Sequence, residues 1–278
     1  MTRTAAVVAG LIMLVAVVGP LVADVVSGYG PTEQIGLPFD VPSAAHPLGT
    51  DALGRDVVSR LLDGGAAVVG LAATATLVTG VVGLLVGVVA GTAPQRTGEV
   101  VVRVVDVLAV VPPLLIVLVL AAGFPGGDGA ILAAVVLVSL PFSVRVNRSA
   151  VDRVAHAGYV EIARARGDGW WRVLRHDILP AVLPTTAAET GLRFVAAVQL
   201  AATAGFLGLG AGPPAANWGR MVAENLPGAA LSPWPFLAPA LVLVALAVAV
   251  NVLAEALTRP SARRRSGRSR PSKEQIDA

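Results

Sequence analysis

Cysteine is absent from this sequence, lysine occurs once, and aromatic residues make up only 4% of its 278 positions. The absence of cysteine excludes disulfides, cysteine-ligated zinc sites and thiol nucleophiles. Charged residues are also scarce, at 14% against about 25% in soluble domains, whereas 55% of the residues are hydrophobic. Few aromatics and long apolar runs argue against a nucleic-acid partner, and basic charge beside such runs is typical of the inner face of a membrane. The composition therefore predicts an integral membrane protein.

The one lysine, Lys273, lies near the end of the chain. A P-loop needs a lysine within G-x-x-x-x-G-K-[ST] to reach the phosphates of ATP, so any ATP-driven motor must be a separate chain. The patterns G-x-S-x-G and H-E-x-x-H are also absent. His176 adjoins Asp177, but neighbouring residues on a helix do not face each other. A membrane-embedded hydrolase is therefore disfavoured, and the chain is predicted not to be an enzyme.

Six apolar stretches qualify as membrane spans, for which a helix needs about 20 mostly apolar residues, and the fourth is the shortest. They are Thr4–Val26, Ala66–Ala90, Val100–Ala122, Ala130–Val146, Thr186–Leu209 and Phe236–Leu257. The first also has the charged start of a signal peptide, but its apolar core is longer than a typical signal core and no A-x-A site follows promptly, which favours an uncleaved helix. The predicted fold is all-α with six transmembrane helices.

Arginine placement orients these helices. With the amino terminus inside, 18 of the 21 basic residues lie in or near inner segments, and only Arg55, Arg60 and Arg220 lie outside. Both termini are therefore predicted to be cytoplasmic in a multi-pass protein of the cell inner membrane. Residues 1–65 form the first span and an outer loop, and 66–258 form a five-helix core with an inner loop at 150–185. Residues 259–278 form a basic tail, predicted to be disordered and to contact anionic lipid.

Glycine and proline mark two features inside the spans. Gly83, Gly87 and Gly91 recur every four residues, which places small residues on one face and predicts close helix packing. Pro112-Pro113 interrupts the third span and predicts a bend, because proline lacks the N–H that a continuous helix needs. An accommodated bend is favoured over a gate.

Charged pairs inside the spans are rare and costly. Arg103 and Asp106 are three residues apart, and Glu189 and Arg193 are four apart, so each spacing predicts an ion pair. Most of these charges are predicted to lie within about two turns of an inner helix end and to snorkel into the interface. With no charge predicted at mid-membrane, a secondary, ion-coupled transporter is disfavoured.

The outer loop contains HPLGTDALGRDVVSRLLDGG at His46–Gly65. Asp51, or the turn Gly54-Arg55-Asp56, is placed to start a helix. Two interpretations stay open: a short helix on the outer membrane surface, or a polar turn capped by acids. The first rests on an apolar pattern at Val57, Val58, Leu61 and Leu62.

The longest polar stretch inside the apolar core is Tyr159–Pro184, which predicts two short amphipathic helices. The first has its pattern at Tyr159, Ile162, Ala163 and Arg166, and Gly167 ends it. Asp168 is predicted to cap the second helix, and Pro180 and Pro184 to end it before the fifth span. Its apolar face is predicted to comprise Trp170, Val173, Leu174 and Ile178. On its own this pattern also fits an ordinary amphipathic loop on the inner face of the membrane.

Three motifs in order carry a specific resemblance. Glu161-Ile162-Ala163, Gly167 and Ile178-Leu179-Pro180 resemble the "EAA" loop of binding-protein-dependent ABC importer permeases, with Ile162 in place of the usual alanine. His46–Gly65 resembles the C-type half of the peptide/nickel permease subfamily. The outer segment FLGLGAGPPAANWGRMVAEN at Phe206–Asn225 is similar to the same subfamily.

This resemblance implies a type I importer permease. Its partners would be a second, B-type permease, two cytoplasmic ATPase subunits and an extracytoplasmic binding protein that delivers the solute. The chain itself would bind no cofactor, and ATP and Mg²⁺ would be used by the ATPase subunits. Peptides are the expected solute, although nickel or another small solute stays open. The implied ATPase-coupling residues are Glu161, Ile162, Ala163, Gly167, Asp168, Ile178, Leu179 and Pro180.

Overall fold

The computed structural model describes residues 3–258 except 125, 211 and 213, and the predicted tail at 259–278 lies outside these residues. The described part is helical, and its only β-pairing consists of two isolated bridges in the first loop, which confirms the all-α prediction. Two short irregular turns, a π-turn at Leu174–Ile178 and a 3₁₀ turn at Leu226–Gly228, accompany the α-helices. The helices are α1 (Arg3–Ser27), α2 (Val57–Thr92), α3 (Gln95–Val110), α4 (Pro113–Gly123), α5 (Asp128–Ala155), α6 (Gly158–Ala165), α7 (Trp170–Val173), α8 (Leu179–Phe206), α9 (Trp218–Asn225) and α10 (Trp234–Thr258).

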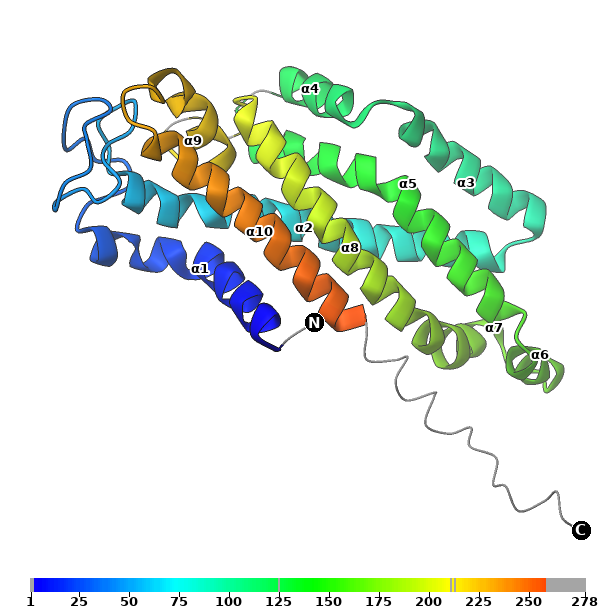
Figure 1. The fold of residues 1–278 in the computed structure, drawn as a ribbon. Helices are drawn as coiled ribbons and strands as arrows, with labels where there is room; N and C mark the ends of the chain where they lie inside the picture. Colours follow the sequence, from blue (N-terminus) through cyan, green and yellow to red (C-terminus); the bar gives the residue numbers. More distant parts are fainter. Residues whose placement is uncertain (1–2, 125, 211, 213, 259–278) are drawn as a thin grey trace, which may run out of the picture.

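The long helices form one elongated bundle with α2 at its centre, packed against α1, α5 and α8 (Figure 1). One end of the bundle carries α6 and α7, and we call it the elbow end. The other end carries residues 28–56 and α9, and we call it the cap end. The start of α1 and the end of α10 both point toward the elbow end. The arginine distribution in the sequence predicts that the elbow end is cytoplasmic and that the cap end lies outside.

Within the part of the chain that the structure describes, four helices are long and apolar enough to cross a membrane: Val7–Ser27 within α1, then α2, α5, and Trp234–Val252 within α10. The broken pair α3 and α4 supplies a fifth if it counts as one span. The predicted fifth span is part of α8, which is as long as α5 and packs against it, but α8 is not among the helices that meet this criterion. The count of six spans therefore stays a prediction.

The second span begins earlier than its apolar pattern indicates. Asp56 caps α2, because its side chain accepts a hydrogen bond from the N–H of Ser59 at 2.7 Å. From Val57 the helix runs without a break to Thr92. The predicted helix start is thus confirmed, but the helix does not lie separately on the membrane surface. It is the first part of the span itself, and Val57 is fully buried.

The proline pair divides the third span into two helices. α3 ends at Val110 and α4 begins at Pro113, and the two axes differ by 81°. Proline tolerates the first turn of a helix, where its missing N–H has no partner in any case. The interruption predicted from the sequence is confirmed, and it is a sharp turn between two helices.

The glycine repeat forms the contact between α2 and α5. A methyl group on Gly83, Gly87 or Gly91 would collide with Ser143, Asn147 or Val151 of α5, respectively. The absence of side chains lets the two backbones approach closely, as the repeat predicted.

Gly87→Ala is therefore expected to destabilise the protein by about 1–3 kcal/mol, because the added methyl group meets both the Asn147 side chain and the backbone of Arg148. Gly70→Ala on the same helix is the matched control, since open space surrounds that position. Unfolding of the purified variants in detergent measures the difference. Equal stability of the two variants would contradict the close packing.

Candidate functional site

The elbow reverses the chain between α6 and α7. Gly167 has a φ of 87°, a left-handed conformation that residues with a side chain rarely adopt. Its N–H donates to the carbonyl oxygen of Arg164 at 2.9 Å, and the N–H of Asp168 donates to that of Ala163 at 3.2 Å. These bonds satisfy carbonyls at the end of α6, so the helix stop predicted at Gly167 is confirmed.

The predicted role of Asp168 as a helix cap is wrong. Gly169 occupies the cap position of α7 and no side chain caps this helix. The Asp168 carboxylate lies 3.4 Å from Arg166 and 3.7 Å from Arg172. The Asp168 carboxylate thus interacts with two guanidinium groups. Asp168 also precedes the cap position of α7 by one residue.

One side of the elbow is anchored to the bundle. Val160 and Ala163 of α6 are buried together with Val173, Leu174 and Ile178 of the following segment. The same apolar cluster includes Ala150, Val151 and Ala155 of α5 and Val88 of α2. The predicted buried face of the second elbow helix is confirmed except for Trp170, which is exposed.

The other side of the elbow carries an exposed surface of large side chains. We define the elbow surface as Tyr159, Glu161, Ile162, Trp170 and Trp171, all of which are exposed. The two tryptophan rings stack with their centroids 5.4 Å apart. Aromatic side chains clustered at the surface are typical of a site for a protein partner. Trp171 lies outside the apolar periodicity of the predicted helix, so the sequence pattern did not indicate it.

The predicted coupling residues thus divide between these two sides. Glu161 and Ile162 belong to the elbow surface, whereas Ala163 and Ile178 are buried in the anchor. Leu179 is half-buried and Pro180 is exposed, at the start of α8.

The elbow continues into α8 without interruption, so the predicted helix end at Pro180 and Pro184 is wrong. A π-turn at Leu174–Ile178 connects α7 to α8, and Pro184 lies inside α8. In the π-turn the N–H of Leu179 donates to the carbonyl oxygen of Leu174, five residues back. Such wider turns accommodate the missing N–H and the ring of a proline within a helix.

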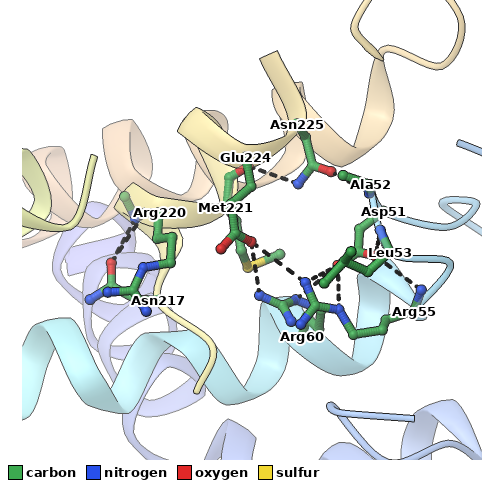
Figure 2. A network of polar contacts seen from close by, with 11 residues as sticks. Asp51, Ala52, Leu53, Arg55, Arg60, Asn217, Arg220, Met221, Glu224 and Asn225 are labelled. Carbon is green, nitrogen blue, oxygen red and sulfur yellow. Dashed lines mark hydrogen bonds and ion pairs between the residues drawn. The ribbon is translucent and has the colours of Figure 1, made fainter. Parts of the chain in front are cut away.

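The cap end holds a buried network of charges (Figure 2). Asp51 lies 2.7 Å from Arg55 and 3.2 Å from Arg60, and Glu224 of α9 lies 3.5 Å and 3.4 Å from the same two arginines. Asp51 and Arg60 are almost completely buried. The network joins the first outer motif to the second, a contact that no spacing in the sequence indicates.

Uncharged groups reinforce the same junction. The side-chain oxygen of Asn225 accepts from the N–H of Ala52 at 2.9 Å, and the Trp218 ring N–H donates to the carbonyl oxygen of Leu61 at 2.6 Å. Nearby, burial raises the pKa of the Asp56 carboxyl, although the N–H of Ser59 and the His46 ring act in the opposite direction. The loop at 28–56 and α9 therefore form one connected cap.

A family model described as the inner membrane component of binding-protein-dependent transport systems matches residues 83–263. The chain belongs to this family. The match includes the elbow and α9, so the resemblance predicted from the motifs is confirmed, and the chain is an inner membrane component of a transport system.

Related proteins of this family cover most of the chain. The di/tripeptide transport system permease protein DppC of Pseudomonas aeruginosa (strain UCBPP-PA14) is 32% identical over 89% of this chain and 84% of its own length. The probable D,D-dipeptide transport system permease protein DdpC of Escherichia coli (strain K12) is 32% identical over 78% of this chain and 72% of its own. A solved structure described as an amino acid ABC transporter with histidines has a TM-score of 0.58 at 16% identity, over 72% of this chain and 93% of that chain. This likeness shows a shared fold.

Asp51→Asn is expected to destabilise the protein by about 3–5 kcal/mol, because it leaves two buried arginines short of a carboxylate. Asp152→Asn is the control, since Asp152 is exposed and its one ion pair among the described residues is with His156, and its effect should stay below about 1 kcal/mol. Unfolding of both variants in detergent gives the comparison. A similar small loss in both would show that the network contributes little.

Proposed function

We propose that this chain is the permease subunit of an ATP-driven importer and that it passes di- or oligopeptides delivered by an extracytoplasmic binding protein. Family membership supports the importer, and the names of the relatives DppC and DdpC support the peptide. The motifs of the C-type subfamily support a B-type permease as the second membrane subunit. ATP and Mg²⁺ would be used by two cytoplasmic ATPase subunits, since the chain has no P-loop.

The observation that carries this proposal is the elbow. Its exposed surface offers stacked aromatic rings to a partner, and its opposite side is fixed to α2 and α5 by buried aliphatic side chains. The π-turn connects it directly to α8. A partner that moves the elbow therefore moves a membrane helix, whereas a flexible loop would absorb the motion. We propose that the elbow surface docks on an ATPase subunit.

Glu161 supplies the specific contact in this proposal. It is exposed on α6, and no other side chain of the described residues pairs with its carboxylate. The carboxylate is thus free to accept hydrogen bonds from a basic group of the ATPase. The buried side of the elbow holds α6 and the start of α8 in place through Ala163, Ile178 and Leu179. The turn between α6 and α7 is formed at Gly167 and Asp168.

Glu161→Ala is expected to lower ATP-dependent peptide uptake by about tenfold or more, because a hydrogen bond to a charged group is worth about 1.5–3 kcal/mol. ATP hydrolysis and membrane insertion should persist. Glu99→Ala is the control, since this partly exposed glutamate of α3 is not part of the elbow surface. Uptake and ATPase activity are measured together in the reconstituted complex. Uptake that depends on an ion gradient and not on ATP would overturn the importer itself.

Gly167→Pro is expected to uncouple ATP hydrolysis from uptake more severely, because proline requires a φ of about −65° and Gly167 adopts 87°. Gly169→Ala is the matched control, as Gly169 has a φ of −63° and open space around it. The same two assays apply. Unchanged transport in both the Glu161→Ala and Gly167→Pro variants would defeat the coupling role of the elbow.

A further inference from the structure

A stripe of polar side chains runs along one exposed face of α5. Phe142, Arg145, Ser149 and Asp152 follow i, i+3, i+7 and i+10 and share this face. The side chain of Arg145 is 48% exposed, and Phe142 is 41% exposed. The face ends toward the elbow, where a pocket of about 230 Å³ is lined by Arg145, Arg148, Ser149 and Asp152 together with Val102 of α3.

Neighbouring helices add charge on both sides of this face. Asp106 of α3 pairs with Arg145 at 2.8 Å, and the Arg193 guanidinium of α8 lies 5.0 Å from the centre of the Phe142 ring. The pairing of Arg103 with Asp106 predicted from spacing is wrong, since Arg103 instead lies 4.0 Å from Glu99. We call Asp106, Phe142, Arg145, Ser149, Asp152 and Arg193 the polar stripe.

In the predicted arrangement, in which α8 crosses the membrane, Arg193 lies far from both ends of this helix. α8 begins at Leu179, well before the predicted start of the span, so Arg193 is about 20 Å from either end of this helix at a rise of about 1.5 Å per residue. The hydrocarbon region is about 30 Å thick, which places Arg193 inside it whichever helix end lies at the boundary. Arg193 therefore lies farther from the helix end than the two turns that the sequence predicts.

The polar stripe does not have the character of a lipid-facing surface. A guanidinium that is 27% exposed at this depth is strongly disfavoured against lipid. Elsewhere the exposed face of α10 presents Leu241, Val244 and Val248, as expected for contact with lipid. The polar stripe therefore faces water or a polar partner.

A buried hydrogen-bond chain holds Arg193 in position. Its Nε donates to Glu189 at 2.7 Å, and the other oxygen of this carboxylate accepts from Ser143 at 3.1 Å. The predicted pair of Glu189 with Arg193 is thus confirmed. Asn147 donates to Ser143, and Thr186 donates to Asn147 at 2.5 Å. Within the described residues, the terminal nitrogens of Arg193 have no hydrogen-bond partner, so their N–H groups are available to an acceptor from outside.

We propose that the polar stripe lines the translocation path and that the terminal N–H groups of Arg193 bind the carboxylate of a passing peptide. The proposal rests on the proposed function as a peptide importer. A guanidinium presents parallel donors that match a carboxylate, and every unmodified peptide carries one at its C-terminus. Glu189 already balances the arginine charge, which keeps the contact weak enough for the solute to leave. The rest of the stripe extends the polar route to the elbow end.

Access of water to the polar stripe tests whether the stripe lines the translocation path. Because the chain has no cysteine, each single-cysteine variant carries one labelling site in this chain. In inside-out vesicles that hold the assembled transporter with cysteine-free partner subunits, a charged, water-soluble thiol reagent should label Phe142→Cys, Ser149→Cys and Arg193→Cys. Val244→Cys on α10, which is 60% exposed, is the matched control and should stay unlabelled. Equal labelling at all four positions, or none at the three stripe positions, would overturn the path.

A second experiment tests whether Arg193 binds the peptide carboxylate or only neutralises the charge of Glu189. ATP-dependent uptake of trialanine by the reconstituted complex should fall at least tenfold in Arg193→Gln and stay equally low in the double variant Glu189→Gln/Arg193→Gln. Arg193→Lys, which keeps the charge, should retain more uptake than Arg193→Gln. Recovery of uptake in the double variant would show that Arg193 only neutralises Glu189, and would overturn the contact. Absence of ATP-dependent trialanine uptake by the unaltered complex would instead count against the proposed function.

Discussion

Charge in a low-dielectric environment is the constraint on which this structure most depends. An arginine or aspartate at the centre of a membrane helix costs about 2.5–3.5 kcal/mol even by the milder scales. The molecule neutralises buried arginines with carboxylates in two places. At the cap end Asp51 and Glu224 surround two arginines, and inside the bundle Glu189 balances Arg193. Each network also connects segments that are far apart in the chain, so the same contacts that neutralise charge fix the arrangement of the helices.

Close packing gives these networks a stiff frame. The glycines of α2 bring its backbone against α5, and the apolar cluster under the elbow uses side chains from both helices. The elbow is therefore fixed to the same two helices that form the core of the bundle. Because α7 continues through the π-turn into α8, the elbow and Arg193 belong to one continuous helical rod. A displacement of the elbow surface would move Arg193 relative to Asp106 on α3, which belongs to a different part of the bundle.

The sequence predicted the features that depend on local pattern. Apolar runs located the helices, the glycine repeat located a close contact, and Gly167 located the turn of the elbow. The errors arose where a distant partner decides the outcome. Asp168 was expected to cap a helix but lies between two arginines. Asp106 was expected to pair with Arg103 on the same helix but pairs with Arg145 of α5. Arg193 was misplaced because two prolines were taken as a helix end, whereas a π-turn lets the helix continue past them. The cap network joins residues more than 160 positions apart in the chain, a contact that no local spacing indicates.

The two charge networks differ in a way that separates stability from function. At the cap end two carboxylates face two arginines, Arg55 and Arg60, and both arginines are buried, so neither guanidinium is exposed to a further ligand. Arg193 pairs with a buried carboxylate through its Nε, its side chain is 27% exposed, and its guanidinium lies 5.0 Å from the centre of the Phe142 ring. A closed network resists separation of its helices, whereas a half-open one holds a charged group ready for an external acceptor. A transporter needs both properties, because a rigid cap preserves the shape of the path while a weak, accessible contact inside the path lets the solute bind and leave.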